Sequence, residues 1–118
     1  MSTTHARWAL LSLLLAVAAA CAEATTPVSF DGKTWLAASC SGSKRLRMLN
    51  DLERRVLPTL RTEQDVRAIL GDMGTAGMGD RRFLRYCVGP AGVGDNKVWL
   101  DIEIDEAGRV LAWGRNEF

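Results

Sequence analysis

Histidine is almost absent from the sequence. The single histidine among the 118 residues is His5, which lies in a segment that we expect to be removed from the mature chain. Histidine is the commonest general base in enzymes and the commonest metal ligand. Without it the mature chain has no Ser-His or Cys-His pair, so the sequence argues against nucleophilic catalysis of that kind.

An excess of charge of one sign is also lacking. Lysine and arginine number 15 and aspartate and glutamate number 14, which leaves a formal net charge of +1. A nucleic-acid-binding domain usually carries a basic excess that neutralises phosphates. We therefore expect no nucleic-acid partner. The length of 118 residues favours a single small domain.

The main apolar run is too short to cross a membrane as a helix. It extends from Trp8 to Ala20 and only Ser12 interrupts it, whereas a spanning helix needs about 20 apolar residues. Arg7 precedes the run, no acidic residue does, and small residues end it. This order predicts a secretory signal peptide over residues 1–20. A buried N-terminal helix is the alternative.

Cys21 directly follows three alanines, an order that resembles the bacterial lipobox. In a lipobox the cysteine is acylated and becomes the first residue of the mature protein. We therefore predict lipidation of Cys21, a tether over residues 21–29, and a membrane as one partner, bound through buried acyl chains. Ala22 in place of aspartate favours the outer membrane, facing the periplasm. Ordinary signal-peptidase cleavage would instead give a soluble periplasmic or secreted protein.

The other two cysteines are Cys40 and Cys87. If Cys21 is lipidated, an even pair remains in an oxidising compartment, which predicts a disulfide. Such a bond would stabilise the domain by about 3–5 kcal/mol in the chain-entropy description. Two buried free thiols are the alternative. The wide spacing does not fit a redox Cys-x-x-Cys motif.

Two amphipathic helices are expected in the first half of the domain. The first begins after Ser43, its expected cap, and ends at Pro58; the second begins at Thr62, with Asp65 three residues on, and ends at Gly71. The expected apolar stripe of the first helix consists of Leu46, Leu49, Leu52 or Glu53, and Val56.

Three strands are expected in the second half. Residues 81–88 and 97–104 alternate between apolar and polar side chains, and residues 109–115 follow a tight turn at Gly108. The glycine-rich stretches 71–80 and 89–96 are expected to be loops. The sequence thus predicts an α+β domain over residues 30–118, with two helices packed on one face of a three-stranded antiparallel meander.

The opposite face of this sheet is expected to be wet and charged. Acidic residues at 101, 103 and 105 would pair across strands with Arg82 or Arg85 and with Arg109 or Arg115. The same acidic run lacks the glycine and the final glutamate of a calcium loop. The glycine-rich stretches lack the lysine-serine pair of a phosphate-binding loop. We therefore expect no metal, no cofactor, no small-molecule substrate and no enzyme activity.

The order of these motifs resembles the SmpA/OmlA (BamE-like) family of small outer-membrane lipoproteins. The resemblance implies a non-catalytic part of the cell envelope, with outer-membrane protein assembly as the process. The matching positions are Phe30 and Trp35; Arg45, Met48, Asp51 and Leu52; Thr62, Asp65, Val66, Leu70 and Gly71; Tyr86, Val88 and Gly89; and Leu100, Ile102, Asp105, Gly108 and Val110.

The expected function is therefore protein binding as an accessory in cell-envelope maintenance. Trp113, beside Gly114, is the favoured partner-binding residue because tryptophan is enriched at interface hot spots. Arg45, Arg54 and Arg55 of the first helix are further candidates, and a merely solvated face or contact with acidic lipid headgroups are the alternatives for them. An inhibitor or immunity-type module that binds a periplasmic or secreted enzyme is the alternative function.

Overall fold

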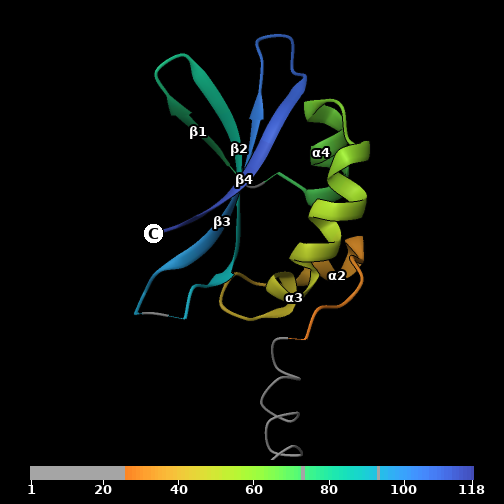
Figure 1. Cartoon of the computed structure of the whole chain (residues 1–118), viewed down its shortest axis with the longest axis vertical. Helices are drawn as coiled ribbons and strands as arrows, with labels where there is room; N and C mark the ends of the chain where they lie inside the picture. Colours follow the sequence, from red (N-terminus) through yellow and green to blue (C-terminus); the bar gives the residue numbers. More distant parts are fainter. Residues whose placement is uncertain (1–25, 73, 93) are drawn as a thin grey trace, which may run out of the picture.

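The computed structural model describes residues 26–72, 74–92 and 94–118. The predicted signal peptide, Cys21 and the first part of the predicted tether lie outside these residues. The domain has two layers, with helices on one side of an antiparallel sheet (Figure 1). The class is thus α+β, as expected from the sequence.

The sheet has four strands, so the predicted three-stranded meander is wrong. Its order is β1-β2-β3-β4, and each neighbouring pair is antiparallel. The strands are β1 (Thr75–Met78), β2 (Arg81–Pro90), β3 (Lys97–Ile104) and β4 (Val110–Glu117).

The additional strand is β1, which lies in a glycine-rich stretch that was expected to be a loop. Its sequence, TAGM, has weak strand propensity. Met78 nevertheless pairs with Arg81, which leaves a two-residue turn whose first residue, Gly79, has a φ of 64°. A tight hairpin turn accepts positive φ there. The long strand β2 then supplies the hydrogen-bonding partner that the local sequence does not predict.

A short helix, α2 (Gly32–Ala37), precedes the two that the sequence predicts. The Asp31 side chain caps it by accepting hydrogen bonds from Thr34 N at 3.3 Å and Thr34 Oγ1 at 2.5 Å. Trp35 is fully buried and its Nε1 donates to the Leu70 carbonyl at 3.2 Å. These tertiary contacts stabilise a helix of six residues, which is too short to be stable in isolation.

The first predicted helix is α3 (Lys44–Asp51), extended by a π-helical turn η1 (Leu52–Val56) and a 3₁₀ turn η2 (Leu57–Thr59). Pro58 lies within the 3₁₀ turn, so it does not end the helix where expected, and the Ser43 side chain makes no capping hydrogen bond. Leu49 and Leu52 of the expected stripe are buried, as predicted, whereas Leu46 and Val56 are only partly buried. The buried stripe consists of Arg45, Met48, Leu49, Leu52 and Leu57.

The second predicted helix is α4 (Glu63–Leu70), and its predicted start and end are confirmed. Thr62 accepts a hydrogen bond from Asp65 N, and the Asp65 side chain accepts one from Thr62 N. This reciprocal capping box supplies partners for two backbone donors. Gly71 follows with a φ of 86°, a conformation that favours glycine at a helix end.

The core lies between the helices and the covered face of the sheet. The predicted alternation is confirmed on β2 and β3, where Leu84, Tyr86, Leu100 and Ile102 are at most 1% exposed. Tyr86 Oη donates to the Gly71 carbonyl at 2.7 Å. Burial raises the pKa of Tyr86 to about 12, so the phenol stays protonated as a donor at neutral pH.

Candidate functional site

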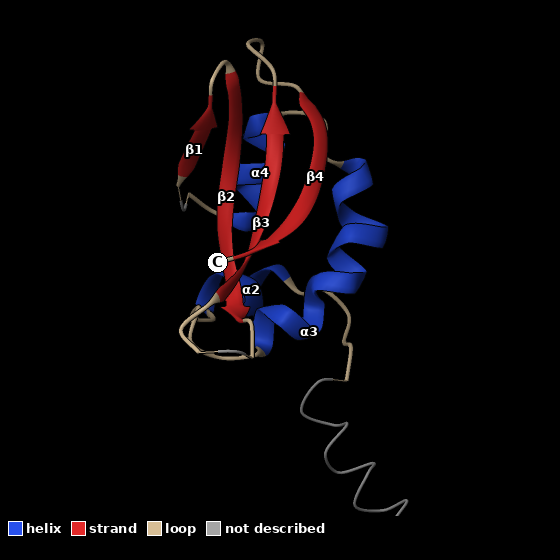
Figure 2. Ribbon diagram, turned by 60° about the vertical axis from the view of Figure 1, so that its left-hand side comes forward, coloured by secondary structure: helices blue, strands red, loops and turns tan. Residues whose placement is uncertain are grey.

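One face of the sheet carries no helix of the residues that the structure describes. Figure 2 shows the strands with α2 and α4 behind them. Paired residues of neighbouring strands share a face, and residues two apart on a strand do too, so the register assigns this surface, which we call the open face. It comprises Ala76 and Met78 of β1; Arg81, Phe83, Arg85 and Cys87 of β2; Trp99, Asp101 and Glu103 of β3; and Ala112, Gly114 and Asn116 of β4.

A partly buried ion pair lies at the centre of the open face. Arg85 Nε and Nη2 donate to the two Asp101 carboxylate oxygens at 2.7 and 3.0 Å. Asn116 Nδ2 donates to the same carboxylate at 2.6 Å. Asp101 is only 5% exposed, and these donors compensate for its lost hydration. The hydrogen bond with Asp101 raises the pKa of Arg85, which keeps the Arg85 guanidinium charged.

A second ion pair joins the same two strands, β2 and β3, nearer to the β1–β2 turn. Arg81 Nε and Nη2 donate to the Glu103 carboxylate at 2.9 and 3.0 Å. The hydrogen bond from Arg81 lowers the pKa of Glu103. The cross-strand pairing predicted for Arg85 is confirmed. Arg82 does not join the acidic face: it lies 3.5 Å from Glu63 of α4 instead.

The other two arginines predicted to pair lie elsewhere. Arg109 Nε pairs with Asp105 Oδ2 at 2.8 Å, but this pair lies within the β3–β4 turn and not across two strands, as the sequence had predicted. Arg115 does not pair with the acidic residues of β3. Its guanidinium contacts Glu53 of η1 and donates to Asn50 Oδ1 of α3 at 2.7 Å, because Arg115 faces the helices in the register of β4.

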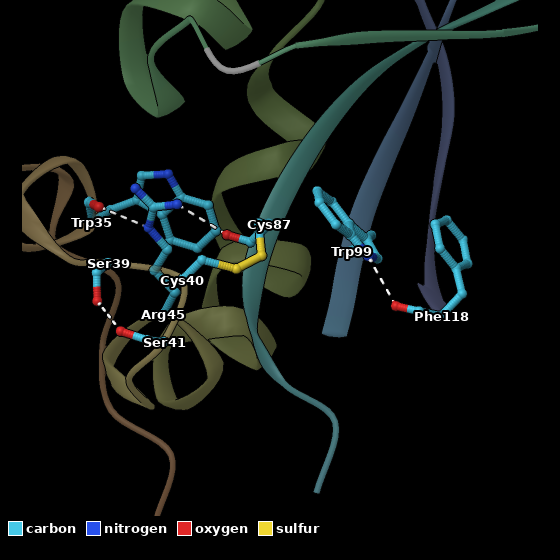
Figure 3. The surroundings of a disulfide bond; sticks show 8 residues. All are labelled: Trp35, Ser39, Cys40, Ser41, Arg45, Cys87, Trp99 and Phe118. Carbon is cyan, nitrogen blue, oxygen red and sulfur yellow. Dashed lines mark hydrogen bonds between the residues drawn. A yellow bond between two sulfur atoms is a disulfide. The ribbon is translucent and has the colours of Figure 1, made fainter. Parts of the chain in front are cut away.

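Aromatic rings lie against these arginines. The Phe118 ring stacks on Trp99 with centroids 6.0 Å apart and an interplanar angle of 18°. Figure 3 shows the two side chains, with Trp99 on β3 and Phe118 directly after β4. The Arg85 guanidinium lies 4.8 Å from the centroid of Phe118, and that of Arg81 lies 5.1 Å from Phe83. Phe118 is 55% exposed. The open face therefore presents alternating cationic and aromatic surface.

A shallow groove of about 190 Å³ crosses the open face between β2 and β4. Arg81 and Phe83 line one side, and Ala112 and Gly114 line the other. A Cβ built at Gly114 meets no atom within 4 Å, and Gly114 has no positive φ. The fold itself does not require glycine there, so the small residue leaves room on the surface rather than in the core.

The sequence placed Arg85 and the acidic residues of β3 on this face, but they were not predicted to bind a partner. The spacing of Arg81, Phe83 and Arg85, two residues apart on one strand, was the available signal. No sequence pattern around Phe118 predicted that it would lie on this face. It reaches Arg85 only because β4 crosses the sheet toward β2 at its end (Figure 2).

Arg45 does not lie on a surface open to a partner, contrary to the sequence analysis. It is 5% exposed. Its Nε donates to the Trp35 carbonyl and its Nη1 to the Cys87 carbonyl, each at 2.9 Å, and its guanidinium lies 4.8 Å from the Trp35 ring centroid (Figure 3). Burial lowers the pKa of Arg45. This side chain joins α2, α3 and β2.

Arg54 and Arg55 are exposed on η1, as expected, but they lie on the helical layer and not on the open face. Arg55 Nη2 pairs with Asp51 Oδ2 at 2.7 Å. Asp51 also accepts a hydrogen bond from Phe30 N at 2.7 Å. The hydrogen bonds from Arg55 and Phe30 lower the pKa of Asp51 to about 2. Among the described residues, Arg55 therefore positions the Asp51 carboxylate, which holds Phe30 at the start of the domain.

Trp113 is 36% exposed on β4. It pairs with Ile102, a residue of the covered face, and its side chain lines both the groove of the open face and the groove beside η2. The four predicted partner-binding residues thus do not form one surface. The aromatic residues that gather with arginine are Phe83, Trp99 and Phe118 instead.

Cys40 and Cys87 lie as a disulfide pair, with Cα atoms 5.6 Å apart (Figure 3). The bond links the segment after α2 to the end of β2. Next to it, a Cβ built at Gly89 would lie 2.9 Å from the Gly42 carbonyl and the Leu46 side chain. The chains approach closely here, so this corner of the molecule is structural.

Among residues 26–72, 74–92 and 94–118, no three His, Cys, Asp or Glu side chains could together hold a metal ion. None of the helices in this described part is long and apolar enough to cross a membrane. No protein-family model, curated protein or solved structure matches the chain.

Proposed function

We propose that this chain is an exported lipoprotein whose domain binds a protein partner in the cell envelope through the open face, without catalysing a reaction. The observation that supports this most is the cluster of Arg81, Phe83, Arg85, Trp99 and Phe118. Tryptophan and arginine are the residue types that dominate binding energy at interfaces. Here they lie on a sheet rather than on a loop, so little order has to be gained on binding.

The ion pairs on the open face support the same function. Arg85 and Arg81 are each fixed by two hydrogen bonds to a carboxylate. The planar faces of their guanidinium groups lie near aromatic rings, so the surface offers flat apolar area with fixed polar rims. Interfaces combine these features, with apolar centres and hydrogen-bonding rims.

The envelope setting rests on the N-terminal sequence and on the resemblance to the SmpA/OmlA family. The predicted lipid at Cys21 would place the domain beside the membrane. The family implies a partner that takes part in outer-membrane protein assembly. An inhibitor that binds a soluble enzyme would use the same kind of face, and only the identity and location of the partner distinguish the two.

A crosslinked pull-down from native membranes tests the proposal with the variant Gly114→Arg. The new side chain fills the groove, and the fold has room for it because no atom lies within 4 Å of a Cβ at this position. Gly42→Arg is the matched control, since Gly42 has equal room and also lacks a positive φ. We expect Gly114→Arg to lose the partner and Gly42→Arg to retain it. Equal recovery by both variants contradicts binding at the open face.

The variant Cys21→Ser, run in the same pull-down, tests the anchor. We expect the wild type to recover envelope assembly proteins and Cys21→Ser to leave the membrane fraction and recover them poorly. Recovery of one soluble enzyme by both forms would replace the assembly role with the inhibitor role. A Cys21→Ser protein that stays in the membrane fraction contradicts lipidation.

A further inference from the structure

The outer edge of β4 has no strand beside it along most of its length. In the described chain, β4 pairs with β3 alone. Phe118 and Lys97 exchange both backbone hydrogen bonds. In an antiparallel ladder the alternate residues then point their N–H and C=O groups away, which are Trp113, Arg115 and Glu117. Residues 111–117 are all exposed.

The chain itself already pairs a segment with the beginning of this edge. Val110 N donates to the Arg61 carbonyl and Glu63 N donates to the Gly108 carbonyl, each at 2.8 Å. Thr62 forms an antiparallel bridge with Arg109. The edge therefore accepts a strand, but the chain before Arg61 turns into η2, and the positions beside residues 111–117 receive no backbone partner from the described residues.

A groove of about 580 Å³ lies beside the free edge. Its apolar lining comes from η2 and Leu60 on one side and from β4 on the other. Leu111 is 59% exposed there. The lining residues used in this argument are Leu57, Pro58, Leu60, Val110, Leu111 and Trp113.

Arg61 also lines this groove and is exposed. Within the described residues its guanidinium forms no ion pair at 4 Å or less, whereas the other arginine of the groove, Arg109, pairs with Asp105 at 2.8 Å. A cationic side chain in the lining of an apolar groove complements a carboxylate on an apolar segment. Strand edges that lie beside such grooves bind extended peptides by adding a strand.

We propose that the edge of β4 binds an extended segment of a partner protein by strand addition. The segment places apolar side chains in the groove between η2 and β4 and a carboxylate against Arg61. Its backbone pairs with Trp113, Arg115 and Glu117. Trp113 lines both this groove and the groove of the open face, but strand addition uses the backbone edge of β4 and does not depend on the function proposed for the open face.

A displayed library of random ten-residue segments tests strand addition, with the purified, exported Cys21→Ser chain as bait. We expect selected segments to combine alternating apolar residues with an acidic residue. Arg61→Glu should weaken their binding about tenfold, because an attraction becomes a repulsion. Changing the acidic residue of the peptide to lysine should restore binding to Arg61→Glu. Gly114→Arg, on the open face, should bind these segments like the wild type.

Backbone methylation of a selected peptide tests the hydrogen bonds themselves. Methylating every second amide should weaken binding at least about tenfold in one phase and little in the other, since only alternate amides face the neighbouring strand. The proposal is overturned if no segment is enriched or if both phases behave alike. It is also overturned if Gly114→Arg, and not Arg61→Glu, loses the peptide, or if light scattering shows that β4 pairs with a second copy.

Discussion

The two faces of the sheet are formed by alternate residues of the same strands, and one face is apolar and buried whereas the other is charged. On β3, Leu100 and Ile102 face the helices and are fully buried. Asp101 and Glu103, their neighbours in the chain, face away and bind arginines. The covered face is stabilised by apolar area removed from water, and the open face by paired charges whose net contribution is small.

This difference teaches which face is free to serve binding. Substitution on the covered face changes packing and therefore stability. The open face contributes less to stability, so its arginine and aromatic side chains can be adapted to bind a partner at little cost to the fold. The buried carboxylate of Asp101 is the exception, because it is only 5% exposed and depends on Arg85 and Asn116.

The largest contrast is expected between Leu100→Ala and Met78→Ala. Leu100 is fully buried on the covered face, and its truncation should lower the free energy of unfolding by about 3–5 kcal/mol through lost burial and a cavity. Met78 is 66% exposed on the open-face side, and its truncation should cost less than about 0.5 kcal/mol. Urea unfolding measures both. Similar costs for the two variants would contradict the assignment of the faces.

Removal of the disulfide tests the connection between the helical layer and the sheet, because the bond links the segment after α2 to the end of β2. The double variant Cys40→Ala, Cys87→Ala should lower the free energy of unfolding by about 2–4 kcal/mol. Thiol titration of the native and the unfolded protein without reductant is the first measurement. Two reactive thiols after unfolding would show that the pair is not bonded.

The structural features that depend on residues close together in the sequence could be predicted. The Thr62–Asp65 capping box and the alternation of β2 and β3 depend on neighbours within four residues, and both are present in the structure. The alternation predicted that Arg82 or Arg85 would pair with an acidic residue of the neighbouring strand, and the register of the sheet selects Arg85 with Asp101. Local rules thus predicted most of the sheet and one ion pair of the candidate face.

Features that depend on distant residues were not predictable. Arg45 is buried because its guanidinium reaches carbonyls of Trp35 and Cys87, 10 and 42 residues away. The strand β1 forms because β2 extends far enough to pair with it. Phe118 joins the open face only through the path of β4 (Figure 2). In each case tertiary context outweighs the local propensity.

Alkaline pH is expected to weaken the covered face through Tyr86. Its pKa is raised by burial to about 12 in the folded protein, from the ordinary value of 10.0 for a tyrosine. A raised pKa means that the folded state retains its proton longer than the unfolded state, so this contribution is complete below pH 10 and is lost as the pH rises toward 12. The loss should reach about 2–3 kcal/mol.

Tyr86→Phe is the control for this pH dependence. It removes the hydrogen bond to Gly71, which should cost about 0.5–1.5 kcal/mol at neutral pH. The difference in unfolding free energy between wild type and variant should then shrink and change sign as the pH rises from 10 to 12. A constant difference over this range would contradict burial of an ionisable phenol.

The smallest effects are expected on the open face, where two ion pairs can be compared. A double-mutant cycle on Arg85 and Asp101 should give a coupling of about 1 kcal/mol, since one partner is buried and the geometry is bidentate. The cycle on Arg81 and Glu103 should give a smaller coupling, because the Arg81 side chain is 55% exposed.

Salt sharpens this comparison, because mobile ions screen exposed charges more than buried ones. Raising the ionic strength should reduce the coupling of Arg81 with Glu103 by a larger fraction than that of Arg85 with Asp101. Equal salt sensitivity would mean that Asp101 is as hydrated as Glu103. The open face would then be uniformly wet, and Arg85 would be as free as Arg81 to exchange its carboxylate for one on a partner.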